Sequence, residues 1–353
     1  MASLLCFLVV LASLTTATAL RNPLRRRFNN IPQKAATTPE DARVLAEAAT
    51  PAGRAKLADV KKVLSDKSFI SSVTSALPSF GGEATAEELA EIASARAALP
   101  DDTWLASRTD AELLPFARCN NADGLAARLA ETSEWRSRII PDASDDSWEF
   151  ANFFEANKDK MFVNEELGER PFMEWVPARD TDDASSAPTQ LDGASLLILR
   201  PGRHNVGAID SDTWLKLIAW HGERATTTWA REAAERGDGG TAGVALIVDR
   251  RGSGLRNQDP ALLRALLPAL TKNFPYSLHT AYVAPINVVF YAIWAVARLV
   301  LPKAVTARFT LLTGDGYADR LRERLGPDVA ARLNAVESKW AGQCVVDECL
   351  EPL

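Results

Sequence analysis

The hydrophobic pattern divides the chain into a helical part and a later part in which buried strands alternate with helices. Between residues 85 and 141 apolar residues recur at helical spacing, as at Leu125 and Leu129. Thr85 and Thr109 each stand three residues before a glutamate, which is the capping box that begins a helix. Residues 85–141 are therefore expected to form a small helical unit.

Three short apolar runs follow a polar loop at residues 178–190. They are Leu196–Leu199, Val244–Val248 and Phe309–Leu312. Runs of this length without a polar interruption are typical of strands that are buried on both faces of a parallel sheet. Helical patterns lie between the runs, and this alternation predicts an α/β domain with right-handed crossovers.

Polar residues mark where several helices are expected to begin. Asp123 and Ser211 each precede an apolar periodic segment and are expected to be N-caps. Asp259 is a third expected N-cap, because Pro260 follows it at the first helical position.

If the stretch Ile286–Leu301 forms a helix, that helix is apolar on all sides. Pro285 and Pro302 bound the stretch. A helix of this kind must be buried or must face lipid. A membrane span is one interpretation, but the stretch is shorter than the roughly 20 residues that a span needs. It also carries Arg298 and lies between two predicted core strands. The pattern leaves two other interpretations open, which are a buried core helix and a movable lid over an apolar cavity.

The first 37 residues have the character of a targeting leader. Leu4–Leu14 is apolar and uncharged, and Ala17-Thr18-Ala19 follows it as a small-x-small cleavage pattern. A basic, acid-free segment then runs to the first acid, Glu40. This order resembles the two-part leader of algae with secondary plastids and predicts a plastid protein. A plain secretory signal before a basic arm is the alternative, and a cytoplasmic location is a further one.

Composition narrows the classes of protein further. A hydrophobic content of 47% is too high for a disordered chain. The net charge is −6 and no basic cluster follows the first 30 residues, which argues against a nucleic-acid partner. Cys119, Cys344 and Cys349 are the cysteines beyond the leader, and so sparse a set favours neither a disulfide framework nor a metal site.

Signatures of catalysis are missing from the sequence. It contains no His-Glu-x-x-His, no Gly-x-Ser-x-Gly and no phosphate-binding Gly-x-x-x-x-Gly-Lys. Gly252-Ser253-Gly254 resembles the start of a dinucleotide turn, although Asn257 stands where the third glycine belongs. A dinucleotide-dependent α/β enzyme that uses the turn at Gly252 is therefore the alternative function. The arginines at positions 250, 251 and 256 are expected to lie in a solvated loop.

The histidines add no catalytic group. His204, His221 and His279 are far apart in the sequence and none has an obvious partner. Each is interpreted as an ordinary surface or core residue rather than as a ligand or a base.

Short motifs over roughly residues 101–343 resemble those of the CRAL-TRIO, or Sec14-like, lipid-transfer family. Leu113–Arg118 resembles the family's Leu-Leu-Arg-Phe-Leu-Arg opening, and Glu134-Trp135-Arg136 resembles its Glu-Trp-Arg. Tyr282–Pro285 stands where the family has an Asn-Ala-Pro turn. The other matching motifs, in chain order, are Ala122-Asp123, Leu199–Gly202, Ile247–Asp249, Asn273–Tyr276 and Trp340–Gly342.

The resemblance implies a small N-terminal helical unit packed on an α/β domain with a mostly parallel sheet. It makes Ile286–Leu301 the gate helix over a lipid pocket. The implied function is non-enzymatic binding and transfer or presentation of a hydrophobic ligand, with no cofactor and with transient contact to a membrane surface. The expected pocket and gate residues are Tyr282, Val289, Phe290, Ile293, Trp294 and Ala297.

The head-group positions of the family depart from its pattern here. Phosphatidylinositol-transfer members carry a basic pair, an acid and a lysine at these positions. In this chain the basic pair falls on Asn120 and Asn121, and the acid falls on Tyr276. Arg308 alone keeps the expected charge. Because phosphate recognition needs charge-assisted donors, the ligand is expected to be a lipid or isoprenoid other than phosphatidylinositol.

The expected organisation follows from the pattern and the resemblance together. In chain order it is a signal-like leader at 1–19, a basic transit-like segment at 20–37, a helical extension at 38–100, the helical unit at 101–160, the lipid-binding domain at 161–345 and a tail at 346–353.

Overall fold

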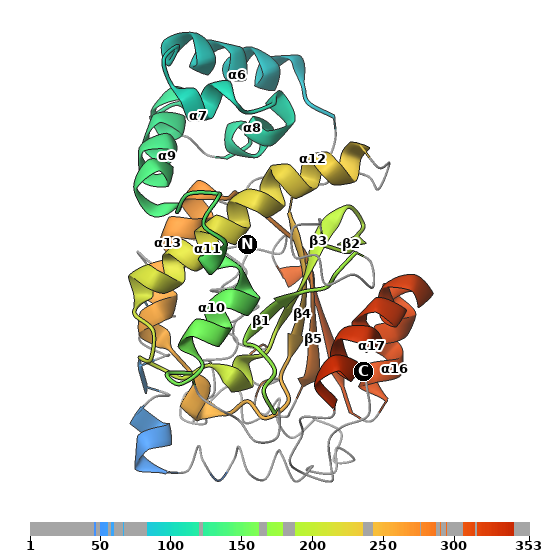
Figure 1. The fold of residues 1–353 in the computed structure, drawn as a ribbon. Coiled ribbons are helices and arrows are strands. Elements are labelled where there is room, and N and C mark those ends of the chain that lie inside the picture. The colour runs from blue at the N-terminus through green and yellow to red at the C-terminus, as the bar shows by residue number, and fades with distance from the viewer. Residues whose placement is uncertain are drawn as a thin grey trace, which may run out of the picture.

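A helical unit stands above a three-layer α/β domain in the computed structural model, which has helices on both faces of one sheet (Figure 1). The structure describes residues 46, 50–55, 58–59, 66, 83–119, 123–161, 168–178, 188–235, 243–275, 277–286, 290, 294, 306–314 and 316–341.

Four helices make up the helical unit. They are α6 (Ala86–Ala98), α7 (Thr103–Ala106), α8 (Asp110–Ala117) and α9 (Leu125–Ile139). The capping boxes predicted at Thr85 and Thr109 are both formed, which confirms those helix starts. The N-cap predicted at Asp123 is wrong, because Gly124 occupies that position and α9 begins without a side-chain cap. The apolar faces of the four helices meet in a small core of their own.

The sheet is mostly parallel, as the sequence predicts. Its strands are β1 (Met173–Trp175), β2 (Gln190–Leu191), β3 (Ala194–Leu199), β4 (Val244–Asp249), β5 (Leu278–Ile286) and β6 (Phe309–Thr313). The order is β1-β3-β4-β5-β6, with β2 also beside β3; β3 to β6 are parallel, whereas β1 and β2 run antiparallel to β3. The three predicted runs are β3, β4 and β6. The turn implied at Tyr282–Pro285 lies instead within β5.

Sequential strand order decides where the connecting helices lie. Right-handed crossovers that always step in the same direction place every connection on one face of the sheet. The helices before and between the strands are α10 (Phe150–Asn157), α11 (Ser211–Thr226), α12 (Thr228–Glu235) and α13 (Pro260–Asn273). The helices after β6 are α16 (Tyr317–Leu325) and α17 (Pro327–Ala341), and they cover the other face (Figure 1). Short 3-10 helices are η2 (Asp146–Trp148), η4 (Pro201–Arg203) and η5 (Leu255–Asn257).

Two of the predicted helix caps lie in this domain. Asp259 caps α13 as predicted, and its side chain accepts a hydrogen bond from the amide of Leu262. At α11 the cap is Asp210 rather than the predicted Ser211, which is the first helical residue.

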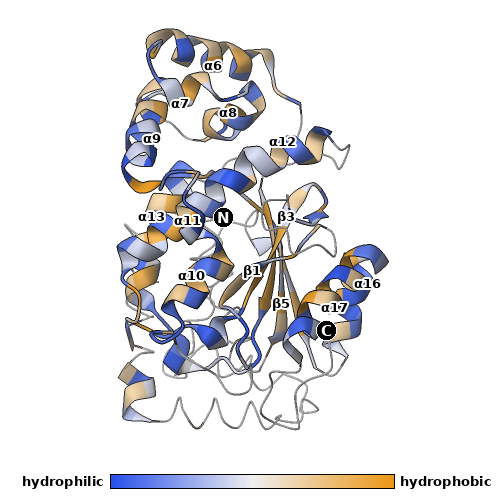
Figure 2. Ribbon diagram, viewed as in Figure 1, coloured by the Kyte–Doolittle hydropathy of each residue, from blue (hydrophilic) through white to orange (hydrophobic). Residues whose placement is uncertain are grey.

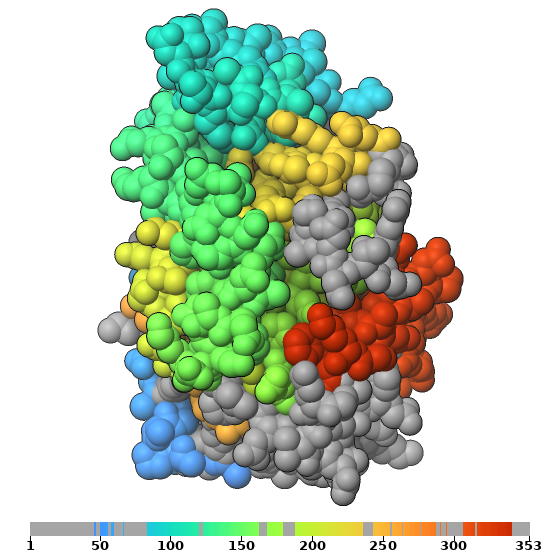
Figure 3. All heavy atoms as spheres, viewed as in Figure 1, coloured from blue at the N-terminus to red at the C-terminus, as the bar shows by residue number. Residues whose placement is uncertain are grey.

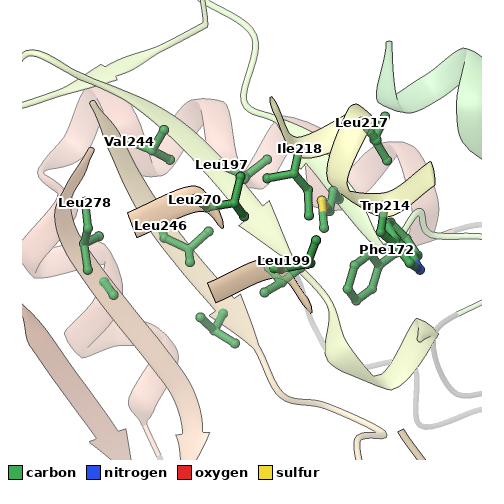
Figure 4. Packing of buried hydrophobic residues seen from close by; sticks show 14 of the residues in the cluster. Phe172, Leu197, Leu199, Trp214, Leu217, Ile218, Val244, Leu246, Leu270 and Leu278 are labelled. Carbon is green, nitrogen blue, oxygen red and sulfur yellow. The ribbon is translucent and has the colours of Figure 1, made fainter. Parts of the chain in front are cut away.

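Each face of the sheet has its own hydrophobic core. The larger core packs alternate residues of β3 and β4 against α10, α11 and α13, and Figure 4 shows Leu197, Leu199, Val244 and Leu246 within it. The smaller core packs the intervening residues against α16 and α17. Both strands are buried at every position, which explains their uninterrupted apolar sequences and the apolar colour of the sheet in Figure 2.

Arg136 is one of several arginines that fasten the helical unit to the α/β domain. The Arg136 guanidinium of α9 lies over the rings of Trp104 and Phe274, at 4.7 and 4.4 Å from their centroids. It donates to the carbonyl oxygen of Asn273 at 3.0 Å and pairs with Glu223 at 3.4 Å. Burial lowers its pKa to about 10, partly offset by Glu223, so it remains charged at neutral pH.

A buried ion cluster joins the sheet to α17. Glu337 of α17 accepts from Arg200 at 2.9 Å and from Arg251 at 2.8 Å, and it pairs with Arg170 at 3.2 Å. Arg251 also contacts Asp249 at 2.6 Å, and Arg200 contacts Glu174 at 3.0 Å. The ion cluster is Arg170, Glu174, Arg200, Asp249, Arg251 and Glu337. Its three positive and three negative charges balance.

Burial and charge act in opposite directions on Glu337. Burial raises the pKa of its carboxyl group, but the charges of Arg200, Arg251 and Arg170 outweigh burial and lower the pKa to about 2. The expectation that Arg250 and Arg251 lie in a solvated loop is wrong, because each is only 3% exposed. Charged residues this deeply buried need partners, and Arg251 finds them in Asp249 and Glu337.

Glu337→Gln is expected to destabilise the fold strongly. The substitution keeps the shape of the side chain but leaves three buried guanidinium groups without their shared anion. Removing one partner of a buried ion pair costs about 3–5 kcal/mol. Urea unfolding measures the loss, and Glu323→Gln on the exposed side of α16 is the matched control. A loss no larger than that of the control would contradict the assigned role of the cluster.

His221 is held neutral in the larger core. Trp175 donates its indole N–H to Nδ1 of His221 at 2.8 Å, and Nε2 contacts the carbonyl oxygen of Trp148 at 2.8 Å. Nδ1 therefore accepts and Nε2 donates, which fixes one neutral tautomer. Burial lowers the pKa of His221 well below 6.5.

The stability of the protein is expected to fall as the pH drops below about 6.5, the ordinary pKa of histidine in an unfolded chain. Below that pH the unfolded state binds a proton that the folded state rejects. The expected slope is about 1.4 kcal/mol per pH unit. Urea titrations between about pH 7.5 and 5.5 measure the slope. His221→Gln should flatten it more than His279→Gln, and an equal effect of the two variants would refute the assignment.

Candidate ligand-binding site

Two of the predicted gate residues lie in the larger core. Phe290 and Trp294 are 1% and 8% exposed and pack with the strand residues of that face. The predicted gate residues Val289, Ile293 and Ala297 lie outside the described residues.

Phe290 and Trp294 contact residues at the ends of two different strands. The guanidinium of Arg250, directly after β4, lies 4.3 Å from the centroid of the Phe290 ring. The rings of Trp294 and Phe309 are 5.2 Å apart, and Phe309 begins β6. In a parallel sheet, the carboxyl end of one strand and the amino end of another lie at opposite ends of the strands. Phe290 and Trp294 therefore lie near opposite ends of the strands on the larger-core face.

Tyr282, the remaining predicted pocket residue, lies on the other face of the sheet. It is half-buried and packs against the smaller core. Burial, together with the charge of Asp192, raises the pKa of its hydroxyl group. The fold therefore separates Tyr282 from Phe290 and Trp294.

Arg308 is the described member of the predicted head-group set. It directly precedes β6, and its carbonyl oxygen accepts from the amide of Ala281 at 2.8 Å. Burial lowers the pKa of the neighbouring His279, and the charge of Arg308 lowers it further against the opposing effect of Asp192. The other three members, Asn120, Asn121 and Tyr276, lie outside the described residues.

An aromatic hollow lies on the larger-core side of the sheet, beside α10 and α11. It is small, with a free volume of about 10 Å³, which is room for about one water molecule. Its lining residues are Phe150, Phe153, Phe154, Met161, Phe172, Met173, Trp214 and Leu217. In the space-filling view of Figure 3, the atoms of α10 cover this part of the molecule. The sequence did not predict the hollow, because its lining comes from separate segments.

The turn at Gly252 is closed by its own hydrogen bonds. The amide of Gly254 donates to Oδ1 of Asn257 at 2.9 Å, and the amide of Arg251 donates to Asp249 at 3.0 Å. The carboxylate of Asp259 occupies the N-terminus of α13. A dinucleotide phosphate needs free amides and a helix N-terminus without a competing anion. The geometry of this turn therefore argues against the dinucleotide alternative.

Within the described ranges, no helix has the length and apolar character that crossing a bilayer requires. Most of the stretch Ile286–Leu301 lies outside those ranges.

Residues 189–332 match the model of the CRAL/TRIO domain. The match begins at β2 and runs through β6 and α16 into α17, so it includes the larger-core face and Arg308. No curated protein matches the chain.

Arg250 and Phe290 are expected to be energetically coupled. A cation over an aromatic ring contributes about 0.5–2 kcal/mol, more where water is excluded. A double-mutant cycle with Arg250→Met and Phe290→Leu, followed by urea unfolding, measures the coupling. Arg250→Met combined with Ile92→Val in α6 is the control cycle, because Ile92 belongs to the core of the helical unit. Equal coupling in the two cycles would rule out the specific contact.

Proposed function

The chain belongs to the CRAL/TRIO family through its domain at residues 189–332, and on that premise we propose that it is a non-enzymatic carrier of one hydrophobic ligand. The domain supports lipophilic ligand binding or transfer in general. The finer proposal is that the ligand, a lipid or an isoprenoid, lies against the larger-core face under Phe290 and Trp294. Their deep burial against that face carries the proposal.

The energetics favour this face as the ligand site. It is lined by aliphatic and aromatic side chains. Each Å² of apolar surface that a ligand and this face remove from water stabilises the complex by about 25 cal/mol. A hydrocarbon chain that replaces Phe290 and Trp294 against the strands keeps that surface dry. The connection after β5 then acts as a gate that moves outward when the ligand enters. A transient contact of the gate with a membrane surface provides lipid for the exchange.

The ligand is proposed to be other than phosphatidylinositol. A phosphoinositide brings at least one negative charge into a partly desolvated site, and burying an unpaired charge costs several kcal/mol. At the four head-group positions the sequence offers two asparagines, one tyrosine and Arg308. Hydrogen bonds to charged groups contribute about 1.5–3 kcal/mol each, so the loss of two or three lowers affinity by orders of magnitude.

The leader supports a plastid location as a separate proposal. An apolar segment, a cleavage pattern and a basic segment follow one another over residues 1–37. Imaging of a fluorescent protein fused to these residues, in an alga with a secondary plastid, tests it. Retention in the secretory pathway or in the cytoplasm would contradict it.

The purified chain is expected to carry one hydrophobic molecule after incubation with mixed lipids and isoprenoids. Native mass spectrometry detects the added mass. Ala281→Leu adds volume on the larger-core face of β5 and should reduce occupancy, whereas Ala245→Leu on the opposite face of β4 is the matched control. Overpacking costs about 1–3 kcal/mol at either site, so both variants are checked for folding. A chain that stays empty with every lipid class would refute the carrier.

Phosphatidylinositol is expected to move between vesicles much more slowly than with a phosphatidylinositol-transfer member of the family. A vesicle-to-vesicle assay with labelled phosphatidylinositol measures the rate. Arg308→Ala should change it little, as should Arg324→Ala, an exposed arginine of α16 that serves as the control. Fast transfer that Arg308→Ala abolishes would show that Arg308 forms a working phosphate site.

A further inference from the structure

Helices α11 and α13 meet near their carboxyl ends on the larger-core side of the sheet. Gly222 of α11 faces Phe274, the C-cap of α13, and a methyl group on its Cα would lie 3.4 Å from the Phe274 ring. Because Gly222 has no side chain, the two helices approach closely at this point. Both helices send apolar side chains into the larger core, among them Leu217 and Leu266.

Arg136 of α9 binds both helices beside this contact. Its guanidinium lies 4.4 Å from the centroid of the Phe274 ring and donates to the carbonyl oxygen of Asn273 at 3.0 Å. On α11 it pairs at 3.4 Å with Glu223, the residue after Gly222. Figure 1 shows α9 beside α11 and α13. One side chain of the helical unit thus joins the carboxyl ends of α11 and α13.

This arginine supplies position more than stability. Burial works against its charge and lowers its pKa to about 10, and its Nε has no hydrogen-bond partner among the described residues. Glu223 has a second and shorter ion pair, with Arg108 at 2.9 Å. A buried ion pair often adds no stability over apolar side chains of similar size. Its hydrogen bonds nevertheless depend on direction, so they fix the two helices relative to each other.

The position of α11 and α13 matters because both helices cover the face that the proposed ligand occupies. The packing of a protein core leaves little free space, so an apolar molecule enters or leaves only when covering elements move. We infer that Arg136 is a positioning residue for ligand exchange. By joining Glu223 to Asn273 it keeps α11 and α13 closed over the larger-core face and slows entry and release. The inference rests on the proposed carrier function and gives the helical unit a part in its regulation.

Hydrogen exchange of the ligand-free full chain, followed by mass spectrometry, tests the joining of the helices. Arg136→Met keeps an apolar chain against the Phe274 ring and leaves Glu223 its other arginine. It should speed amide exchange in the last turns of α11 and α13 at least tenfold. Arg96→Met is the matched control, because Arg96 bonds two carbonyl oxygens and a carboxylate within the helical unit itself. The control should leave the amides of α11 and α13 unchanged.

Nile red, a neutral dye that fluoresces in apolar surroundings, tests ligand exchange by stopped flow. Arg136→Met should raise both the association and the dissociation rate of the dye at least threefold and change its Kd less than twofold. Both rates rise together because a looser cover lowers the barrier to entry and to release without removing a contact to the bound dye. A merely structural role would raise the dissociation rate alone and weaken binding. Equal rate changes in Arg136→Met and Arg96→Met would overturn the inference.

Gly222 provides a second test that leaves the helical unit intact. Alanine at this position fits against Phe274, so Gly222→Ala should keep the wild-type rates. Gly222→Leu has to push α11 and α13 apart and should raise both Nile red rates as Arg136→Met does. Circular dichroism confirms that each variant is folded. A folded Gly222→Leu chain with wild-type rates contradicts the inference.

These outcomes are distinguishable from a failure of the carrier function. Nile red binding that is normal, with hydrogen exchange and dye rates unchanged in Arg136→Met, would reject the role of Arg136 and keep the carrier. A wild-type chain that takes up neither Nile red nor any lipid would reject the carrier, and with it the effect on ligand exchange. Hydrogen exchange would then still show whether Arg136 joins the two helices.

Discussion

The shared carboxylate of Glu337 is the interaction on which the arrangement of the α/β domain depends. Arg200 follows β3 and Arg251 follows β4, so the ends of two central strands meet at one side chain of α17. Charges this deep are stable only when every partner is present, because each desolvated ion costs several kcal/mol when left alone. The cluster therefore fixes α17 to the sheet in a single position. Hydrogen bonds and ion pairs, which depend on direction, therefore hold α17 on the smaller-core face.

The opposite face is held together by contacts of another kind. Phe290 and Trp294 meet the sheet through rings, with Arg250 and with Phe309. Apolar contacts have little directional preference, and one apolar surface replaces another at low cost. In the proposed carrier, a ligand that is mostly hydrocarbon would substitute for these rings without breaking a hydrogen-bond network. The fold thus combines a face fixed by ion pairs with a face held by apolar and ring contacts, and the proposed carrier would exchange its ligand at the second face.

Local patterns predicted the parts of the fold that local forces determine. β3 and β4 were predicted because strands buried on both faces have uninterrupted apolar sequences. β6 also has an apolar sequence, although only two of its five residues are fully buried. Polar residues such as His279 and Thr280 concealed β5. The burial of Arg251 was missed because its partner Glu337 is 86 residues away. Only the family resemblance pointed to Phe290 and Trp294 as gate residues. The hollow could not be predicted, since tertiary packing alone brings its segments together.

Contacts of Trp135 and Arg136 with α13 explain what the motif Glu134-Trp135-Arg136 does in the structure. Trp135 meets the ring of Phe274 edge-on at 6.0 Å, and Arg136 lies over the same ring. Phe274 is the C-cap of α13, so the helical unit fixes that end of the helix. Asp259 fixes the other end and holds His204 with the same carboxylate. Because both ends of α13 are anchored, the helical unit contributes to the placement of His204 through this helix.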